Sequence, residues 1–408
     1  MLSRQFLSWA DRASAGERAD AARDLARAFL YADIDVVEHG AMERAMTCLT
    51  DDPSPLVRRA LAEALAGASD APHHLVSALA ADQSDIAAVV LARSPVLGDA
   101  ELIDAAALGE EPAQCAIASR PGLSAAVAGA LAEVGGSAAV LVLCRNDGAT
   151  LADVSVRRIL ERFGDDGDIR SALGGRPDLD VALRQELVAA TADALRRFAT
   201  SCGWIGPERA RRVAAEATER ATLVLANQAG EHEGDLGRLR FAAHLRRTGQ
   251  LTPALVLRAL MSGQRPLFEA ALAELSGQSL ARVAGLVRHH DGLAFAALLR
   301  SSGLPDGLLP VIRTALGAEA RADPAIPAPV LRRHIVGRVL SHCAAERALP
   351  IAGLMALLRR FEAEAAREES RATPQATPRP DVAVPKAPPA VAARIEPRFE
   401  PVLHLAAA

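Results

Sequence analysis

The segment "CAIASRPGL", residues 115–123, is one of four similar stretches in this chain. The related stretches are "VVLARSPVL" at residues 89–97, "LVLCRNDGA" at 141–149 and "SALGGRPDL" at 171–179. Each contains an arginine near the same place, and these residues are Arg93, Arg120, Arg145 and Arg176. They are separated by 27, 25 and 31 residues. A period of this size indicates an internal structural repeat.

The residues before each arginine predict a short helix. Residue types that begin helices stand eight positions earlier, at Asp85, Pro112, Ser137 and Asp168. An apolar residue stands three positions before each arginine, at Val90, Ile117, Val142 and Leu173. We therefore expect each arginine to close a helix of about two turns whose apolar side faces inward.

The residues after each arginine predict a second helix in every unit. The candidate N-caps are Asp99, Ser124, Thr150 and Asp180. Glycines are expected to end these helices or break the chain, at Gly109, Gly135, Gly164 and Gly174, with the helix-ending glycines in the left-handed conformation. Prolines at Pro95, Pro121 and Pro177 favour a turn between the two helices.

Two short helices per unit predict an all-α fold, an α-solenoid of HEAT-like helical pairs. The composition agrees, because 50% of the residues are hydrophobic but only 3% are aromatic. Alanine and leucine favour helices, whereas strands favour β-branched and aromatic residues. We expect a repeat region at residues 1–200, a second helical region at 201–370 that continues the stack, and a tail at 371–408.

Three longer stretches carry a family resemblance, namely "VRRALAEALAGASDAPHHLVSALAADQSDIAAVVLARSPVLGDAELIDAA" at 57–106, "AIASRPGLSAAVAGAL" at 116–131 and "LTPALVLRALMSGQRPLFEAALAEL" at 251–275. Together they resemble a bacterial family, common in alphaproteobacteria, of unknown function and with HEAT-like helical pairs. The resemblance runs from about Gly16 to about Gly317. It implies a helical-repeat fold and brings no activity and no catalytic residues.

The repeated arginines have two interpretations. An arginine at a helix C-terminus can bind the last carbonyl oxygens and can also reach an acidic cap in the next unit, which would form a ladder along the repeats. Alternatively, Arg93, Arg120, Arg145 and Arg176 could line a groove for an acidic partner or a phosphate. We favour the ladder, because consensus residues of such repeats usually maintain stacking.

Charge and residue usage exclude several classes of protein. Residues 1–200 hold 19 arginines and 30 acidic residues, whereas residues 201–370 hold 22 and 17. Acidic repeats and only 12 aromatic residues disfavour nucleic-acid binding. Lys386 in the tail is the only lysine, so the folded part has no phosphate-loop or Schiff-base lysine. The five cysteines form no CxxC pair, which argues against a zinc cage.

No pattern assigns a catalytic, cofactor-binding or metal-binding residue. The richest loop is "GEHEGD" at 230–235, whose side chains could gather a divalent ion but match no known metal motif. We interpret it as a solvated connection. The pairs His73–His74 and His289–His290 are also unsuited to a shared ion, because neighbours on a helix point about 100° apart.

The tail has eight prolines in 38 residues, which predicts an extended and mostly disordered segment. Its apolar end could serve as a docking motif formed by Phe399, Val402, Leu403 and Leu405. The sequence has no signal core at its start, and the weakly charged stretch at 123–144 contains a "GGS" break. We therefore expect a helical hairpin there, no membrane span, and a cytoplasmic protein.

These observations favour a non-enzymatic scaffold or regulatory adaptor whose curved face binds another polypeptide. The alternative is a HEAT-like enzyme that is metal-assisted or acts on nucleic acid. The sequence leaves the identity of the partner, the pathway and the oligomeric state open.

Overall fold

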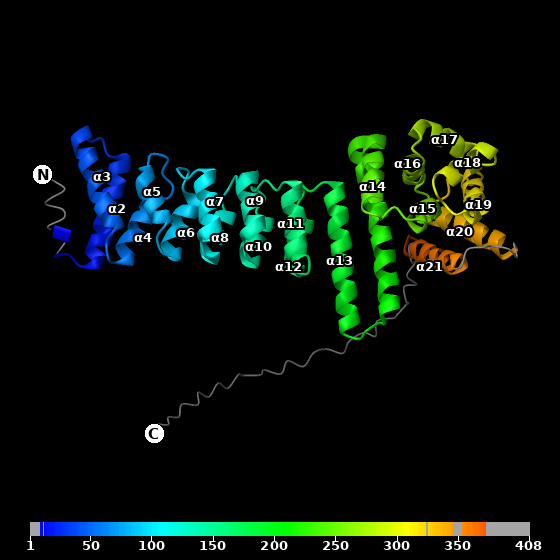
Figure 1. Ribbon diagram of the computed structural model, residues 1–408, viewed down its shortest axis with the longest axis horizontal. Helices are drawn as coiled ribbons and strands as arrows, with labels where there is room; N and C mark the ends of the chain where they lie inside the picture. Colours follow the sequence, from blue (N-terminus) through cyan, green and yellow to red (C-terminus); the bar gives the residue numbers. More distant parts are fainter. Residues whose placement is uncertain (1–8, 11, 324, 346–352, 373–408) are drawn as a thin grey trace, which may run out of the picture.

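The computed structural model describes residues 9–10, 12–323, 325–345 and 353–372. These residues form helices joined by turns and loops, without a strand among them (Figure 1). The prediction of an all-α chain is confirmed. The tail residues 373–408, including Phe399, Val402, Leu403 and Leu405, lie outside the described part.

The first twelve helices form two rows that run along the molecule (Figure 1). The first row consists of α2 (Ala15–Tyr31), α4 (Pro55–Leu65), α6 (Ser84–Arg93), α8 (Glu111–Ala118), α10 (Ser137–Arg145) and α12 (Gly167–Gly175). The second row consists of α3 (Val36–Thr50), α5 (His73–Ala80), α7 (Asp99–Leu108), α9 (Ala125–Val134), α11 (Asp153–Phe163) and α13 (Val181–Ser201). Helices of the first row pack on their successors in that row, which is the nearest-neighbour stacking that an α-solenoid predicts.

Small apolar side chains let these short helices approach closely. In α9 the buried residues are Val127, Ala128, Leu131 and Ala132, which recur at the spacing of one helix face. The break after α9 lies at Gly135 and Gly136, and α10 returns beside it. The weakly charged stretch at 123–144 is therefore a buried helical hairpin, as predicted. None of the helices in the described ranges is long and apolar enough to cross a membrane.

The chain continues from α13 into a more compact group of helices. Its members are α14 (Pro207–Arg247), α15 (Pro253–Met261), α16 (Arg265–Ser276), α17 (Leu280–Arg288), α18 (Leu293–Ser301), the 3₁₀ turn η1 (Asp306–Leu308), α19 (Leu309–Ala320), α20 (Ala328–Ala345) and α21 (Leu354–Ala372). Within α14 the chain reverses at Gly234, whose φ of 62° is left-handed. Residues without glycine's conformational freedom rarely adopt this conformation.

Two apolar cores correspond to these two parts. One core contains buried residues from Ala19 to Leu187, and the other contains buried residues from Leu223 to Phe361. The long helices α13 and α14 pack against each other between them. Val181 and Val188 of α13 also pack against the second core, so α13 contributes to both.

The glycines that end α7, α9 and α11 are needed for a reason that differs from the prediction. Gly109, Gly135 and Gly164 have φ values of −80°, −61° and −61°, so none is left-handed. A β-carbon at these positions would lie only 2.4–2.5 Å from the carbonyl oxygen four residues earlier. Close approach of the backbone, and not a special φ, therefore selects glycine here.

Some predicted helix boundaries shift by one to three residues. Ser124 and Asp180 cap α9 and α13 as predicted, because their side chains accept the backbone N–H groups of Val127 and Leu183. Thr150 is not the N-cap of α11, which begins only at Asp153. The break predicted near Gly174 is confirmed to within one residue, because α12 ends at Gly175.

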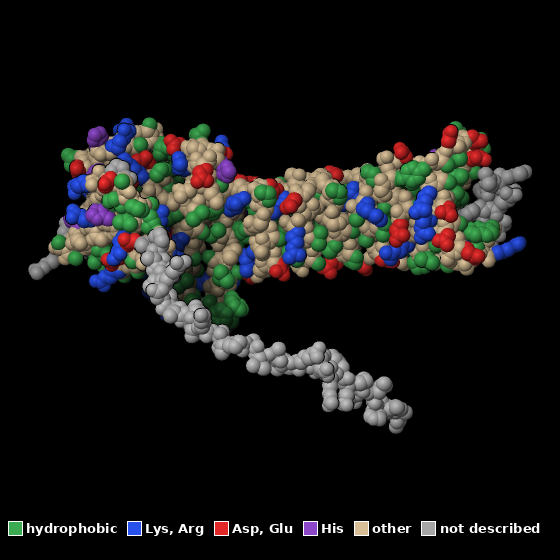
Figure 2. Space-filling view, turned by 180° about the vertical axis from the view of Figure 1, so that it is seen from behind, with side chains coloured by type: hydrophobic (Ala, Val, Ile, Leu, Met, Phe, Trp, Pro, Cys, Tyr) green, Lys and Arg blue, Asp and Glu red, His purple; other side chains and the backbone are tan. Residues whose placement is uncertain are grey.

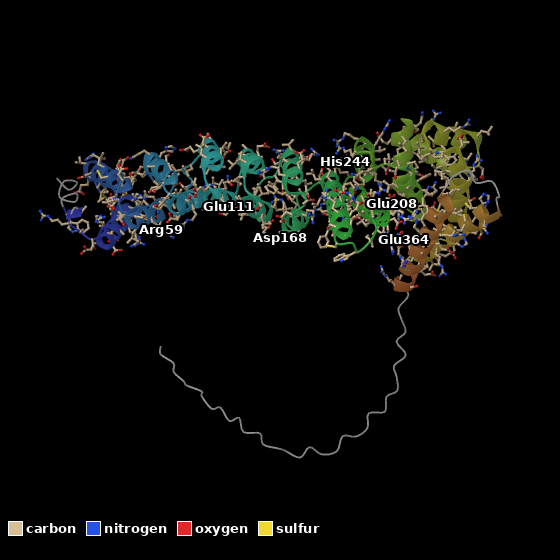
Figure 3. All side chains as sticks on the ribbon, turned by 60° about the horizontal axis from the view of Figure 1, so that its bottom comes forward. Arg59, Glu111, Asp168, Glu208, His244 and Glu364 are labelled. Carbon is tan, nitrogen blue, oxygen red and sulfur yellow. The ribbon has the colours of Figure 1, made fainter. Side chains whose placement is uncertain are left out.

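Polar side chains join successive helices of the first row. The guanidinium of Arg18 binds Asp52 before α4, at 2.8 and 2.9 Å, and Arg58 binds Asp82 before α6 in the same way. Ser84 Oγ then donates to Glu110 before α8 at 2.8 Å. Figure 3 shows Arg59, Glu111 and Asp168 spaced along this row, on α4, α8 and α12. The row thus has side-chain contacts before α4, α6 and α8 as well as an apolar core.

We expect the ion pair of Asp52 to make the N-terminal helices less stable as the pH falls into the acidic range. Its hydrogen bond with Arg18 lowers the pKa of this carboxyl group, and the backbone N–H of Ser54 lowers it further, against the opposing effect of burial. A lowered pKa gives stability that is present above the ordinary carboxyl pKa of about 4 and is lost as the pH falls through the folded-state value. Asp52→Asn should therefore lower the unfolding midpoint at pH 7 and flatten the decline of stability below pH 5. An equally steep acid decline in Asp52→Asn and in wild type would contradict this role.

Candidate functional site

Two of the four repeated arginines bind the helix that precedes their own in the first row. The guanidinium of Arg120 donates to the carbonyl oxygens of Leu91 and Ser94 at the end of α6, at 2.6 and 2.7 Å. Arg176 does the same at the end of α10, where it donates to Asn146 at 2.8 Å and to Ala149 at 2.7 Å. Each arginine places its positive charge at the negative end of a neighbouring helix.

The other two arginines, Arg93 and Arg145, are exposed at the ends of α6 and α10. Neither binds another side chain or carbonyl oxygen within the described ranges. Between α8 and α10 the contact comes from the next residue, Asn146, whose amide donates to the carbonyl oxygens of Ala118 and Arg120, both at 2.8 Å. The structure therefore brings Arg120, Asn146 and Arg176 to equivalent places, rather than the four arginines.

Two further arginines form the same contact, and the comparison of the four repeated stretches did not reveal them. Arg162 of α11 donates to Ala132 and Gly135 at the end of α9, at 2.7 and 2.9 Å. Arg313 of α19 binds the turn after α17. Arg162 is the second-row counterpart of Arg120, and its position in the last turn of α11 was the available signal.

The surface feature best suited to a partner is a groove of about 580 Å³ between α5 and α7. In the described part of the second row, neighbours are closely packed at α3–α5, α7–α9, α9–α11 and α11–α13, but not at α5–α7. The floor is apolar and includes Ala87, Leu91 and Leu97. Leu108, which is 89% exposed, lies on the α7 wall. We call this feature the α5–α7 groove.

Acidic side chains form the rim of the α5–α7 groove, namely Asp82, Glu101, Asp104 and Glu110. Glu101 spans the opening, because it accepts hydrogen bonds from Ser77 Oγ of α5 at 2.9 Å and from its own N-cap residue, Gly98, at 3.0 Å. The backbone N–H of Gly98 and the contacts with Ser77 and His73 lower the pKa of Glu101 despite partial burial. Asp104 is exposed and has no ion-pair partner among the described side chains.

Burial would raise the pKa of the second rim carboxyl, Asp82, but the ion pair with Arg58 and the backbone N–H of Gln83 lower it overall. The rim is thus anionic at neutral pH. An apolar floor beneath an anionic rim is complementary to a polypeptide segment that combines apolar and basic side chains.

With this geometry established, comparison with known proteins gives one match. The sequence profile of a family described as an uncharacterised protein conserved in bacteria (DUF2336) matches residues 86–349. The chain belongs to this family. No curated protein and no solved structure gives a significant match.

The DUF2336 match begins in α6 and extends beyond α20, so it includes helices from both apolar cores. The α7 wall of the α5–α7 groove lies inside the match, and the α5 wall lies outside it.

The acidic segment at residues 230–235 is part of α14 and surrounds the reversal at Gly234. Its carboxylates bind arginines of the returning segment, with Glu233 to Arg240 at 2.7 Å and Asp235 to Arg238 at 2.9 Å. Glu231, His232 and Glu233 line a cavity of about 540 Å³ beside the start of α13. Across the described ranges, no three histidine, cysteine or carboxylate side chains are grouped in a way that could hold a metal ion.

The histidine pairs also separate in the structure. His73 reaches α7, where its Nε2 lies 3.1 Å from Glu101, whereas His74 reaches α3, where its Nε2 lies 3.1 Å from Thr47 Oγ1. The side chain of His290 is only 14% exposed, whereas its neighbour His289 is exposed. Adjacent histidines thus contact different surroundings, as helical geometry predicts for His73 and His74 in α5, whereas His289 and His290 lie in the turn after α17.

Proposed function

We propose that this protein is a non-enzymatic scaffold or regulatory adaptor that binds a segment of another polypeptide. The α5–α7 groove is the single observation that carries this proposal. Its volume of about 580 Å³ is enough for several side chains, and Leu108 on its α7 wall offers an apolar side chain that the helices leave exposed. The anionic rim selects a partner segment with basic residues flanking apolar ones.

The extended shape supports this role, because stacked helical pairs present a long surface to a partner instead of a closed pocket (Figure 1). We further propose that the pairs are HEAT-like repeats and that the protein acts in the cytoplasm of an alphaproteobacterium. In this proposal the hydrogen bonds of Arg120 and Arg176 maintain the stacking and leave the α5–α7 groove to recognise the partner.

A paired substitution in the groove tests the proposal. Asp104→Arg reverses an unpaired rim charge, and Leu108→Asp removes an exposed apolar contact, so neither should disturb the core. Quantitative cross-linking in native cells should recover at least one protein with wild type and lose it about tenfold or more with the double variant. The recovered protein should cross-link to the helices on either side of the groove, through a segment with basic and apolar residues.

A matched double variant controls for the charge changes. Asp70→Arg and Leu293→Asp make the same chemical changes at exposed positions outside the groove, and Leu293 is 87% exposed. This control should retain the partner. Equal recovery of every cross-linked protein with both double variants and wild type would contradict the proposal.

A further inference from the structure

A second recess lies at the opposite part of the molecule and has the opposite charge. It is a hollow of about 470 Å³ bounded by the turn after α17 and by helices α19 and α20. Its lining includes His290, Arg313, Gly317, Arg321 and Arg338. Figure 2 shows blue arginine and purple histidine side chains, with red and green ones among them, over the C-terminal helices. We call this recess the cationic hollow.

The two guanidinium groups of Arg321 and Arg338 in the cationic hollow are not neutralised by the described part of the protein. Arg321 and Arg338 are exposed, and neither forms an ion pair or a side-chain hydrogen bond with any residue that the structure describes. The one carboxylate in the lining, Asp291, has a side chain that is 93% exposed, and one of its oxygens lies 3.9 Å from His290 Nε2. Arg332 and Arg333 of α20 differ, because they pair with Glu368 and Glu369.

Gly317 creates a point where two nitrogen groups converge. A β-carbon at this position would lie 3.6 Å from Arg321 Nη2 and 3.6 Å from His290 Nε2. The two nitrogens therefore face the same small space from different elements, and glycine leaves that space open. An oxygen atom of an anion in front of Gly317, beyond the β-carbon position and at van der Waals distance from Cα, would face both groups.

Arg313 holds this arrangement in place. Its guanidinium donates to the carbonyl oxygens of His290, Asp291 and Gly292, at 2.8, 3.0 and 3.1 Å. These contacts fix the turn that carries His290 against the helix that carries Gly317 and Arg321. They also bind the carbonyl oxygens at the end of α17, which would otherwise oppose an anion.

We propose that the cationic hollow binds the phosphate group of a small soluble ligand. Two free guanidinium groups offer the paired N–H donors that match phosphate oxygens, and the imidazole adds a third contact. The volume of about 470 Å³ lies within the range of small-molecule sites and exceeds what a bare phosphate needs. This site is independent of the α5–α7 groove.

Pyrophosphate is a suitable probe, with inorganic phosphate as the smaller comparison. Titration of the full chain in about 0.15 M salt, followed by calorimetry and ³¹P NMR, should show saturable binding with one site per chain. Arg321→Gln should weaken the binding about tenfold, because it removes a charge-assisted contact.

Gly317→Ala separates binding from folding. The added methyl group meets its neighbours at ordinary contact distance and replaces glycine inside a helix, so the melting temperature should stay the same or rise. The same methyl group projects into the space in front of Gly317 that the anion would need, so pyrophosphate affinity should fall about tenfold or more. A protein that is as stable as wild type but binds less would support the site.

Arg93→Gln and Arg145→Gln are matched controls, because they remove one exposed and unpaired arginine each outside the hollow. Both should bind pyrophosphate like wild type. The proposal is overturned if wild type shows no saturable binding, or if the controls lose as much affinity as Arg321→Gln. It is also overturned if the chain binds phosphatidylglycerol vesicles through these residues but does not bind soluble phosphates. The phosphate group would then belong to a membrane lipid.

Discussion

Replacing Arg176 by alanine is expected to lower the free energy of unfolding by about 3 kcal/mol, since buried acceptors left without a donor cost roughly 1–3 kcal/mol each. The side chain is only 2% exposed. It donates to three backbone carbonyl oxygens around the end of α10, those of Cys144, Asn146 and Ala149, and it pairs with Asp178 at 2.6 Å. Chemical denaturation monitored by circular dichroism measures the change.

The matched control for Arg176 is Arg145→Ala, in the same repeated pattern but exposed and without a partner among the described residues. This variant should change the free energy of unfolding by no more than about 0.5 kcal/mol, as is usual for surface positions. Arg176→Lys should recover only a small part of the loss, because one ammonium group cannot reproduce the planar set of donors. Equal stability of Arg176→Ala and Arg145→Ala would show that the buried contacts contribute little.

The second large effect is expected at Arg258, which links three helices of the second core. Its side chain is 2% exposed and binds Glu219 of α14 and Glu364 of α21, both at 2.6 Å. Its guanidinium carbon lies 4.6 Å from the centre of the Phe361 ring. Figure 3 shows Glu364 on α21, and Arg220 of α14 also binds this carboxylate. Arg258→Ala leaves two mostly buried carboxylates near each other, which should cost about 3–5 kcal/mol.

The charge explanation for Arg258 is tested by removing the carboxylates as well. Arg258→Met with Glu219→Gln and Glu364→Gln should recover most of the stability, because no buried charge is then left unpaired. In Arg258→Ala, the protection of backbone amides from hydrogen exchange should fall first in α21. The ion pairs of Arg258 attach this helix to α14 and α15. A triple variant as unstable as Arg258→Ala would indicate that packing of the arginine stem, and not charge, dominates.

Much of the repeat could be predicted from sequence, because its signals are local. A cap such as Ser124 and the apolar residues that follow it act within a few residues of one another. The helical hairpin formed by α9 and α10 was predictable for the same reason, since two adjacent glycines interrupt an otherwise helical stretch. The boundary of α11 was less predictable, because Thr150 is a suitable cap residue that the chain does not use.

The reason for the helix-ending glycines was not predictable. Sequence statistics favour a left-handed glycine at a helix end. At Gly135 the chain instead leaves α9 in an extended conformation, and the β-carbon position falls against the carbonyl oxygen of Leu131. That distance depends on the path the backbone takes toward the next helix, which the residue types do not specify.

The sequence by itself determined the helical class and the two-helix unit, because helix propensity, capping and apolar spacing are properties of neighbouring residues. Only the tertiary structure decided which arginines bind. A shift of one residue places Asn146 where Arg145 was expected, because α10 ends at Arg145 and the extended backbone of Asn146 turns its side chain toward the neighbouring helix while Arg145 stays exposed. The tertiary structure also decided where the α5–α7 groove and the cationic hollow form. Each is formed by residues from separate helices, whose distances depend on how the cores pack.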